Sequence, residues 1–271
     1  MTSEGARIIG AGRHGSNSRQ MAWAARAGLT ARAVVYLLIG VLAVLVAQGR
    51  NAEVDQQGAL AEVISRPFGG WLVALAAVGF AGYALWRLSE AAFGVAGEGR
   101  AVGPRVQSFV RGLIYAFLAY SAVSVLEGSS TGQSSQQKGY AAQMMVQPGG
   151  RWVVGIAGAI VVVVGLALVV EGLRLTFMRN FSAQAMPPRA RALVTQLGRV
   201  GTTARGLVFA LAGGLVVAAA WTYDANKAGG LDGALKTLRD QPFGPVLLTL
   251  AGLGLVAFGL YGLAEARYRR V

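Results

Sequence analysis

Long apolar segments alternate with short polar connections along the whole chain. Six of these segments are nearly free of charged side chains, over residues 33–47, 71–86, 112–126, 152–170, 206–221 and 246–264. With its flanking residues, each segment reaches roughly 18–22 positions, the length that crosses a bilayer as an α-helix. Because no segment shows an alternating polar face, the pattern predicts an all-α polytopic membrane protein with six transmembrane helices.

The first, third and fifth apolar segments open alike. They begin as GLTARAVVYLLIG, QSFVRGLIYAFLA and GTTARGLVFALAG. Each opening contains an arginine that is followed four positions later by an aromatic residue. The arginines are Arg32, Arg111 and Arg205, and the aromatic residues are Tyr36, Tyr115 and Phe209.

The second, fourth and sixth segments share another pattern. Each is preceded by a proline. A glycine follows two residues after this proline, and a glutamate follows twenty-three residues after it, at the far end of the segment. We interpret the prolines and glycines as hairpin corners: Pro67 and Gly69, Pro148 and Gly150, Pro242 and Gly244. The glutamates are Glu90, Glu171 and Glu265. Constant spacing in three copies indicates an internal repeat.

The repeat unit is a helical hairpin of two membrane crossings, and all three hairpins have the same orientation. We predict a disordered basic cytoplasmic arm over residues 1–20, followed by repeats over residues 21–100, 101–185 and 186–271. Packing around a pseudo-threefold axis is the simplest arrangement of three such units. A linear row of hairpins is the alternative, and the sequence pattern allows both.

The Pro-x-Gly corners predict where each second crossing begins. Proline suits the first turn of a helix, where its missing N–H costs nothing, and it disfavours helical geometry in the preceding residue. We therefore expect each proline to open the second helix of its hairpin and the glycine to allow a sharp bend. Apolar residues at spacings of three and four before the prolines predict short amphipathic helices at the outer interface.

These three Arg-led openings and three Pro-then-Glu helices resemble the domain of unknown function 1206 family, a group of bacterial membrane proteins built from three two-helix repeats. The resemblance covers roughly residues 20–271. The second copy departs most, because no phenylalanine follows Pro148. The resemblance implies the fold and the membrane location, and it implies no activity.

Composition supports a membrane location, and the distribution of charge predicts which side of the membrane each connection faces. The chain is 54% hydrophobic and only 14% charged, whereas soluble domains carry about 25% charged residues. With the N-terminus inside, 18 of the 25 Lys and Arg and only 5 of the 12 acids face the cytoplasm, as the positive-inside rule requires. We expect a bacterial cytoplasmic (plasma) membrane with both termini in the cytoplasm. Anionic lipid headgroups at that face are then the expected partners rather than nucleic acid, and a protein partner or homo-oligomer stays open.

The chain has few groups for catalysis. It has no cysteine, and its one histidine, His14, lies in a Gly/Ser-rich arm, so thiol chemistry and an intramembrane haem or His/Cys metal centre are disfavoured. No nucleophile elbow and no carboxylate pair on one helix face is present. We therefore predict no catalytic, cofactor-binding or metal residues, no cofactor and no enzymatic activity.

The repeated arginines and glutamates are the candidate site. Twenty-three helical residues rise about 34 Å, which brings each glutamate one bilayer away from its outer proline, to the inner edge where the arginines also lie. We expect Arg32, Arg111 and Arg205 to pair with Glu90, Glu171 and Glu265, within hairpins or between neighbours. Such pairs would form a structural ion-pair girdle, and the alternative is a gate or a headgroup site.

Two functions follow from this pattern. The first is a non-catalytic scaffold, accessory or lipid-interacting component. The alternative is a carrier or channel for a small solute, gated by three Arg/Glu pairs at the cytoplasmic face. Mitochondrial carriers also use three two-helix repeats, but their signature motif is absent here. A centre filled tightly by small side chains favours the scaffold, and a water-accessible cavity closed by the charged pairs favours the carrier.

Overall fold

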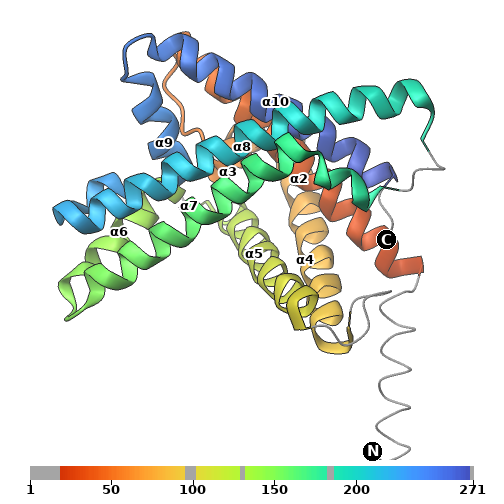
Figure 1. The fold of residues 1–271 in the computed structure, drawn as a ribbon, viewed down its shortest axis with the longest axis horizontal. Helices are drawn as coiled ribbons and strands as arrows, with labels where there is room; N and C mark the ends of the chain where they lie inside the picture. The colour runs from red at the N-terminus through yellow and green to blue at the C-terminus, as the bar shows by residue number, and fades with distance from the viewer. Residues whose placement is uncertain (1–18, 95–101, 129–131, 182–185, 269–271) are drawn as a thin grey trace, which may run out of the picture.

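The computed structural model describes residues 19–94, 102–128, 132–181 and 186–268. The elements in these residues are helices, arranged as long rods with shorter helices at their ends (Figure 1). Residues 1–18 of the predicted basic arm, which include His14, lie outside the described residues.

Six long helices form the body of the molecule. Each is long and apolar enough to cross a membrane, which confirms the six predicted crossings and the all-α fold. They are α2 (Arg19–Ala47), α4 (Gly69–Phe93), α5 (Val102–Leu126), α7 (Gly150–Arg174), α8 (Pro188–Thr222) and α10 (Gly244–Tyr268).

A short helix precedes the second long helix of every repeat, as the spacing of apolar residues predicts. These helices are α3 (Gln56–Ile64), α6 (Gln133–Val146) and α9 (Gly230–Arg239). Asp55 caps α3, because its side chain accepts a hydrogen bond of 2.9 Å from the Gly58 amide. The α6 helix has 14 residues, compared with 9 in α3 and 10 in α9, so the outer segment of the second repeat carries more helix than its counterparts.

The three hairpin corners share one geometry, which differs from the prediction in one respect. Each proline lies in a turn before the long helix, not in its first helical turn, because α4, α7 and α10 begin at the glycine two residues later. The intervening residue has a positive φ, of 64° at Phe68, 76° at Gly149 and 59° at Phe243. This left-handed residue reverses the chain, so the proline ends one helix instead of starting the next.

The glycine at each corner is required by close backbone contact. A Cβ atom would lie 1.8 Å from the Val63 carbonyl oxygen at Gly69 and 1.7 Å from that of Met144 at Gly150. At Gly244 it would lie 1.6 Å from the carbonyl oxygen of Arg239. The long helix therefore starts directly against the end of the preceding short helix, and no other residue fits there without moving the backbone.

The long helices form a ring that is open at one place, rather than a straight row. The second helix of each repeat packs along the first helix of the next, so α4 lies on α5 and α7 lies on α8. The last helix, α10, packs along α2 and joins the third repeat to the first (Figure 1). Three equivalent interfaces between repeats are what a pseudo-threefold arrangement requires.

Glycines allow the closest approaches in these interfaces, as expected for helices in lipid. Between α2 and α10, a Cβ atom on Gly40 would lie 2.6 Å from the Gly252 carbonyl oxygen. Between α7 and α8, the corresponding distance from Gly165 to the Gly206 carbonyl oxygen is 2.7 Å. Close packing therefore accounts for these glycines without a hinge or a solute path.

The ring is open at one place, within the second repeat. The two long helices of the first repeat pack together, as do those of the third, whereas α5 and α7 do not pack along each other over their described lengths. The outward side of α7 is also largely exposed, with Ile156, Ile160 and Val163 uncovered by protein. This opening connects the middle of the ring with the region that lipid occupies around a membrane protein.

Candidate ligand cavity between the three repeats

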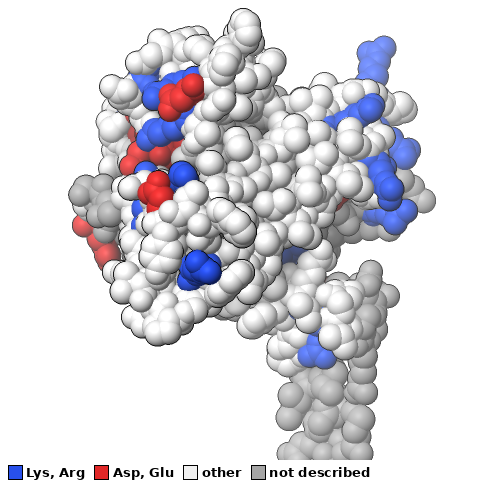
Figure 2. Space-filling model, turned by 60° about the vertical axis from the view of Figure 1, so that its left-hand side comes forward, with Lys and Arg blue, Asp and Glu red and all other residues white. Residues whose placement is uncertain are grey.

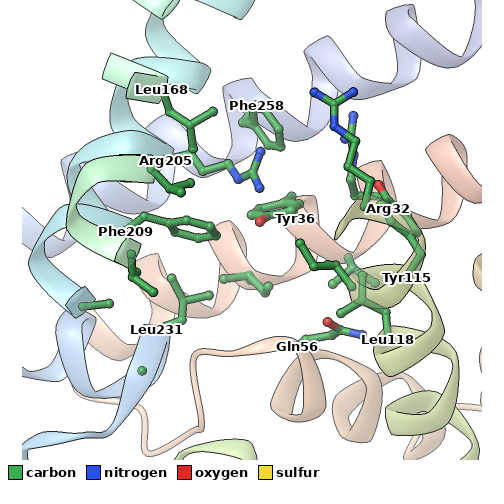
Figure 3. A pocket seen from close by; sticks show the side chains of 18 of the residues that line it. Arg32, Tyr36, Gln56, Tyr115, Leu118, Leu168, Arg205, Phe209, Leu231 and Phe258 are labelled. Carbon is green, nitrogen blue, oxygen red and sulfur yellow. The ribbon is translucent and has the colours of Figure 1, made fainter. Parts of the chain in front are cut away.

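A cavity of about 940 Å³ lies in the middle of the ring (Figure 3). All six long helices contribute residues to its walls, together with the short helices α3, α6 and α9. Its volume is at the upper end of the range for small-molecule sites in proteins. The centre of the molecule is therefore hollow, and is not the tightly filled core that a purely structural scaffold predicts.

The middle of the cavity is apolar. Its walls come from α2, α4, α5, α7 and α8 through Val35, Ile39, Phe80, Ile114, Leu118, Val161, Val164 and Phe209. Two of these helices, α5 and α7, are the ones that border the opening of the ring. The apolar lining of the cavity therefore extends to the open side of the ring.

One end of the cavity is covered by the three short helices, and glutamines line it there: Gln56, Gln133 and Gln137. The backbone amide of Val54 donates a hydrogen bond of 2.9 Å to the Asp232 side chain, which ties the first repeat to α9. Asp232 also forms an ion pair of 2.8 Å with Lys236. Burial raises the pKa of the neighbouring Asp55 to about 6, because its carboxylate loses hydration there.

Among the predicted charged residues, all but Glu90 line the other end of the cavity, and two of them form a buried ion pair there. Arg32 on α2 pairs with Glu265 on α10, and their side chains are only 16% and 6% exposed. The pair joins the first repeat to the third, so it follows the between-neighbours arrangement and not the within-hairpin one. The ion pair therefore lies in the α2–α10 interface, where Gly40 and Gly252 also allow the two helices to pack closely.

Glu90 occupies the corresponding position in the first repeat but has different partners. Arg87 donates to it over 2.6 Å, and Ser108 on α5 donates over 3.1 Å. Arg87 also donates to the Tyr83 hydroxyl over 3.0 Å and lies 4.2 Å from the Trp86 ring. The sequence reasoning missed Arg87 and Ser108, although the three-residue spacing of Arg87 and Glu90 on one helix was a usable signal.

Arg205 on α8 is surrounded by aromatic rings. Its guanidinium carbon lies 4.7 Å from the centre of Phe258, 4.8 Å from Phe209 and 5.1 Å from Tyr36. Figure 3 shows the guanidinium extending into the cavity beside these rings. Among the described residues, no ion pair includes Arg205 or Glu171, and both line the cavity, as does Arg111.

Four hydrogen-bond donors on the cavity wall have no acceptor among the described residues. They are the Nε atoms of Arg32 and Arg205 and the hydroxyl groups of Tyr115 and Thr202. The Thr202 and Tyr115 side chains are deeply buried. Thr202 is not among the predicted site residues. It precedes Arg205 by three positions, as Ser108 precedes Arg111, so an alignment of the repeats could have identified it.

A short turn covers the charged end of the cavity. Leu175 ends α7 with a φ of 56°, and the chain turns back as η1 (Thr176–Asn180). The Phe177 ring is buried 5.1 Å from that of Tyr261, and it lies so close to Gly198 that a Cβ atom there would be 2.4 Å away. Phe177 therefore closes this end while lining the cavity.

The residues that line the cavity have the composition of a ligand site. In the described residues, no group of three or more His, Cys, Asp or Glu side chains is arranged to hold a metal ion. The cavity instead combines an apolar body with one end where positive charge and hydrogen-bond donors gather. Such a combination matches an amphipathic molecule.

The fold and the cavity define a multi-pass membrane protein made of three two-helix repeats. The family model for the Domain of Unknown Function (DUF1206) matches the chain three times, over residues 27–94, 106–174 and 200–269. The chain belongs to this family. It is 30% identical over 249 residues to the uncharacterized protein YxxB of Bacillus subtilis (strain 168), covering 91% of this chain and 90% of that protein. No solved structure matches the chain.

Proposed function

We propose that this protein is a non-catalytic lipid-binding component of the membrane, and that an acyl chain enters its central cavity between α5 and α7. The observation that carries the proposal is the lateral opening of an apolar cavity. Because the long helices are of membrane-crossing length, the opening faces hydrocarbon over much of its height. A lipid chain can then move from bilayer to cavity without crossing water.

The chemistry of the opening supports a lipid chain over a polar solute. On α5, Val110 and Ile114 are exposed beside the cavity, and on α7, Val161 and Val164 are. An acyl chain exchanges one apolar environment for another on passing these residues. A polar solute would lose its hydration at the same place and gain no hydrogen bonds from it.

Exposed arginines support contact with anionic headgroups at one membrane face. Figure 2 shows one end of the molecule where basic side chains gather, opposite an end where both signs of charge mix. The exposed arginines near the ends of α7 and α10, on η1 and in the first half of α8 are Arg174, Arg179, Arg189, Arg191, Arg199 and Arg267. By the positive-inside rule this end is the cytoplasmic one, which supports the plasma membrane as location and anionic lipids as neighbours.

A carrier for a small anionic solute is the second candidate. It is favoured by the cavity itself, since all three repeats line it and polar groups flank its apolar middle at both ends. The Arg32–Glu265 pair and Phe177 would then act as the cytoplasmic closure. Uptake of a solute by proteoliposomes, lost in a Glu265→Gln protein that remains folded, would favour the carrier over the lipid-binding component.

Two matched substitutions on α7 test the lipid-binding proposal. Ala157 and Ala159 are both exposed residues of this helix, but only Ala157 lines the cavity. Ala157→Trp should place an indole in the cavity and reduce the lipid that remains bound after purification and extensive detergent washing, counted by native mass spectrometry. Ala159→Trp should retain the lipid of the unmodified protein. Equal lipid retention in both variants would contradict the proposal.

A further inference from the structure

The charged end of the cavity points to the headgroup of the ligand, and this inference rests on the lipid-binding function proposed above. We propose that Arg205, Thr202 and Tyr115 bind the phosphate of a phospholipid whose acyl chain occupies the apolar part of the cavity. The three side chains come from α5 and α8, in the second and third repeats. They lie within about one helical turn of the repeated arginine positions.

Arg205 is the positive group of this site. Its guanidinium lies among Tyr36, Phe209 and Phe258 and takes part in no ion pair with a described residue. Aromatic rings contact the face of a guanidinium and leave the N–H groups at its edge for hydrogen bonds. The Nε atom of Arg205 is buried without an acceptor, so the arrangement holds a cation in place and leaves its donors for an oxyanion.

Two hydroxyl groups complete the set of donors. Thr202 and Tyr115 are only 3% and 5% exposed, and neither hydroxyl has a hydrogen-bond partner among the described residues. Buried hydroxyl groups are ordinarily hydrogen-bonded. Donors that approach from different helices suit the several oxygens of a tetrahedral phosphate better than the two oxygens of a planar carboxylate.

The charge balance at this end also favours an anion. Three arginines line the cavity against two glutamates. Glu265 pairs with Arg32, and the lining as a whole carries one more positive than negative side chain. A single negative charge, such as that of a phosphodiester, brings the sum for this end to zero, which is the favourable state in a low-dielectric environment.

The test compares two ligands that share their acyl chains and differ in phosphate. Delipidated full-length protein in detergent is titrated with dioleoylphosphatidylglycerol and with dioleoylglycerol, and binding is followed by the shift in unfolding temperature. The phospholipid should bind at least about tenfold more tightly, as charge-assisted hydrogen bonds predict. Arg205→Gln and Thr202→Val should each reduce this preference. Arg151→Gln, which removes an exposed arginine at the start of α7, far from the charged end of the cavity, should keep it.

The outcomes separate the headgroup from the lipid-binding function itself. Equal binding of dioleoylphosphatidylglycerol and dioleoylglycerol to the unmodified protein would overturn the phosphate site while leaving lipid binding intact. Failure of both lipids to bind would overturn the proposed function and the phosphate site together. Oleate that binds as tightly as the phospholipid would assign the site to a carboxylate, and equal stabilisation by inorganic phosphate would assign it to a free ion; either result would overturn the inference.

Discussion

Arg32 and Glu265 form a buried ion pair that joins the first membrane-spanning helix of the chain to the last. The two residues are separated by 233 positions in sequence, and the pair lies where the third repeat closes on the first. The ring therefore depends on a contact that neither repeat contains alone. This contact also forms part of the cavity wall, so the ion pair that joins the repeats also borders the proposed ligand site.

Loss of the buried acid should destabilise the folded protein. Glu265→Gln leaves Arg32 buried without its countercharge, and breaking a buried pair in this way costs about 3–5 kcal/mol. Glu171→Gln is the matched control, since the same substitution there breaks no ion pair seen between described residues. Unfolding midpoints in detergent should fall clearly for Glu265→Gln and little for Glu171→Gln, and the reverse order would contradict the structure.

The corner glycines should tolerate no side chain. In Gly244→Ala the new methyl group would lie 1.6 Å from the Arg239 carbonyl oxygen, so α10 must shift or the corner must open. Gly70→Ala is the control, because nothing lies within 4 Å of a Cβ atom at Gly70, and a helical Gly-to-Ala change adds up to about 1 kcal/mol. The yield of monodisperse protein after extraction should fall for Gly244→Ala and hold for Gly70→Ala. Similar yields would show that the corner is looser than described.

Asp55 should make stability depend on pH. Burial raises its pKa from 3.8 to about 6, so between these values the folded state binds a proton that the unfolded state has lost. The free energy of unfolding should therefore fall as the pH rises from about 4 to about 6 and stay level above that. Asp55→Asn keeps the capping oxygen, should remove this slope, and should raise stability at neutral pH by up to roughly 3 kcal/mol.

The control for this pH dependence is Glu62 on the same short helix. A hydrogen bond from the exposed Arg66 side chain lowers the pKa of Glu62, so Glu62→Gln should leave the slope between pH 4 and pH 6 in place. Urea unfolding in detergent at several pH values measures both variants. A slope that survives Asp55→Asn would contradict the assignment of this titration to Asp55.

Much of the fold could be predicted from the sequence because it depends on length, hydropathy and repetition. The six crossings follow from apolar segments, and the short helices follow from their spacing before Pro67 and its counterparts. The position of proline at the corner was predicted wrongly by about two residues. The positive φ of Phe68 and Phe243 decided the geometry there, and a bulky residue gives no sign of this conformation in sequence.

The site was only partly accessible to the same reasoning. The repeats identified Arg32, Arg205 and Glu265 as equivalent positions, but equivalent positions did not receive equivalent partners. Glu90 bonds with Arg87 and Ser108, whereas Arg205 lies among three aromatic rings. Pairing depends on side-chain contacts across the ring, which a pattern along one chain does not contain. The cavity itself arises because α5 and α7 stand apart, and their sequences alone do not predict that separation.

Photochemical labelling of the cavity wall tests the account most directly. A phospholipid with a diazirine on its acyl chain is added to membranes that contain the protein, and adducts are located by mass spectrometry after irradiation. The account predicts adducts on Ile114 and Val161, which line the cavity, in addition to the outward-facing Leu113 and Val163. Labelling of Ile114 and Val161 should disappear in Ala157→Trp. Adducts confined to Leu113, Val163 and other outward-facing residues would contradict the claim that a lipid chain occupies the cavity.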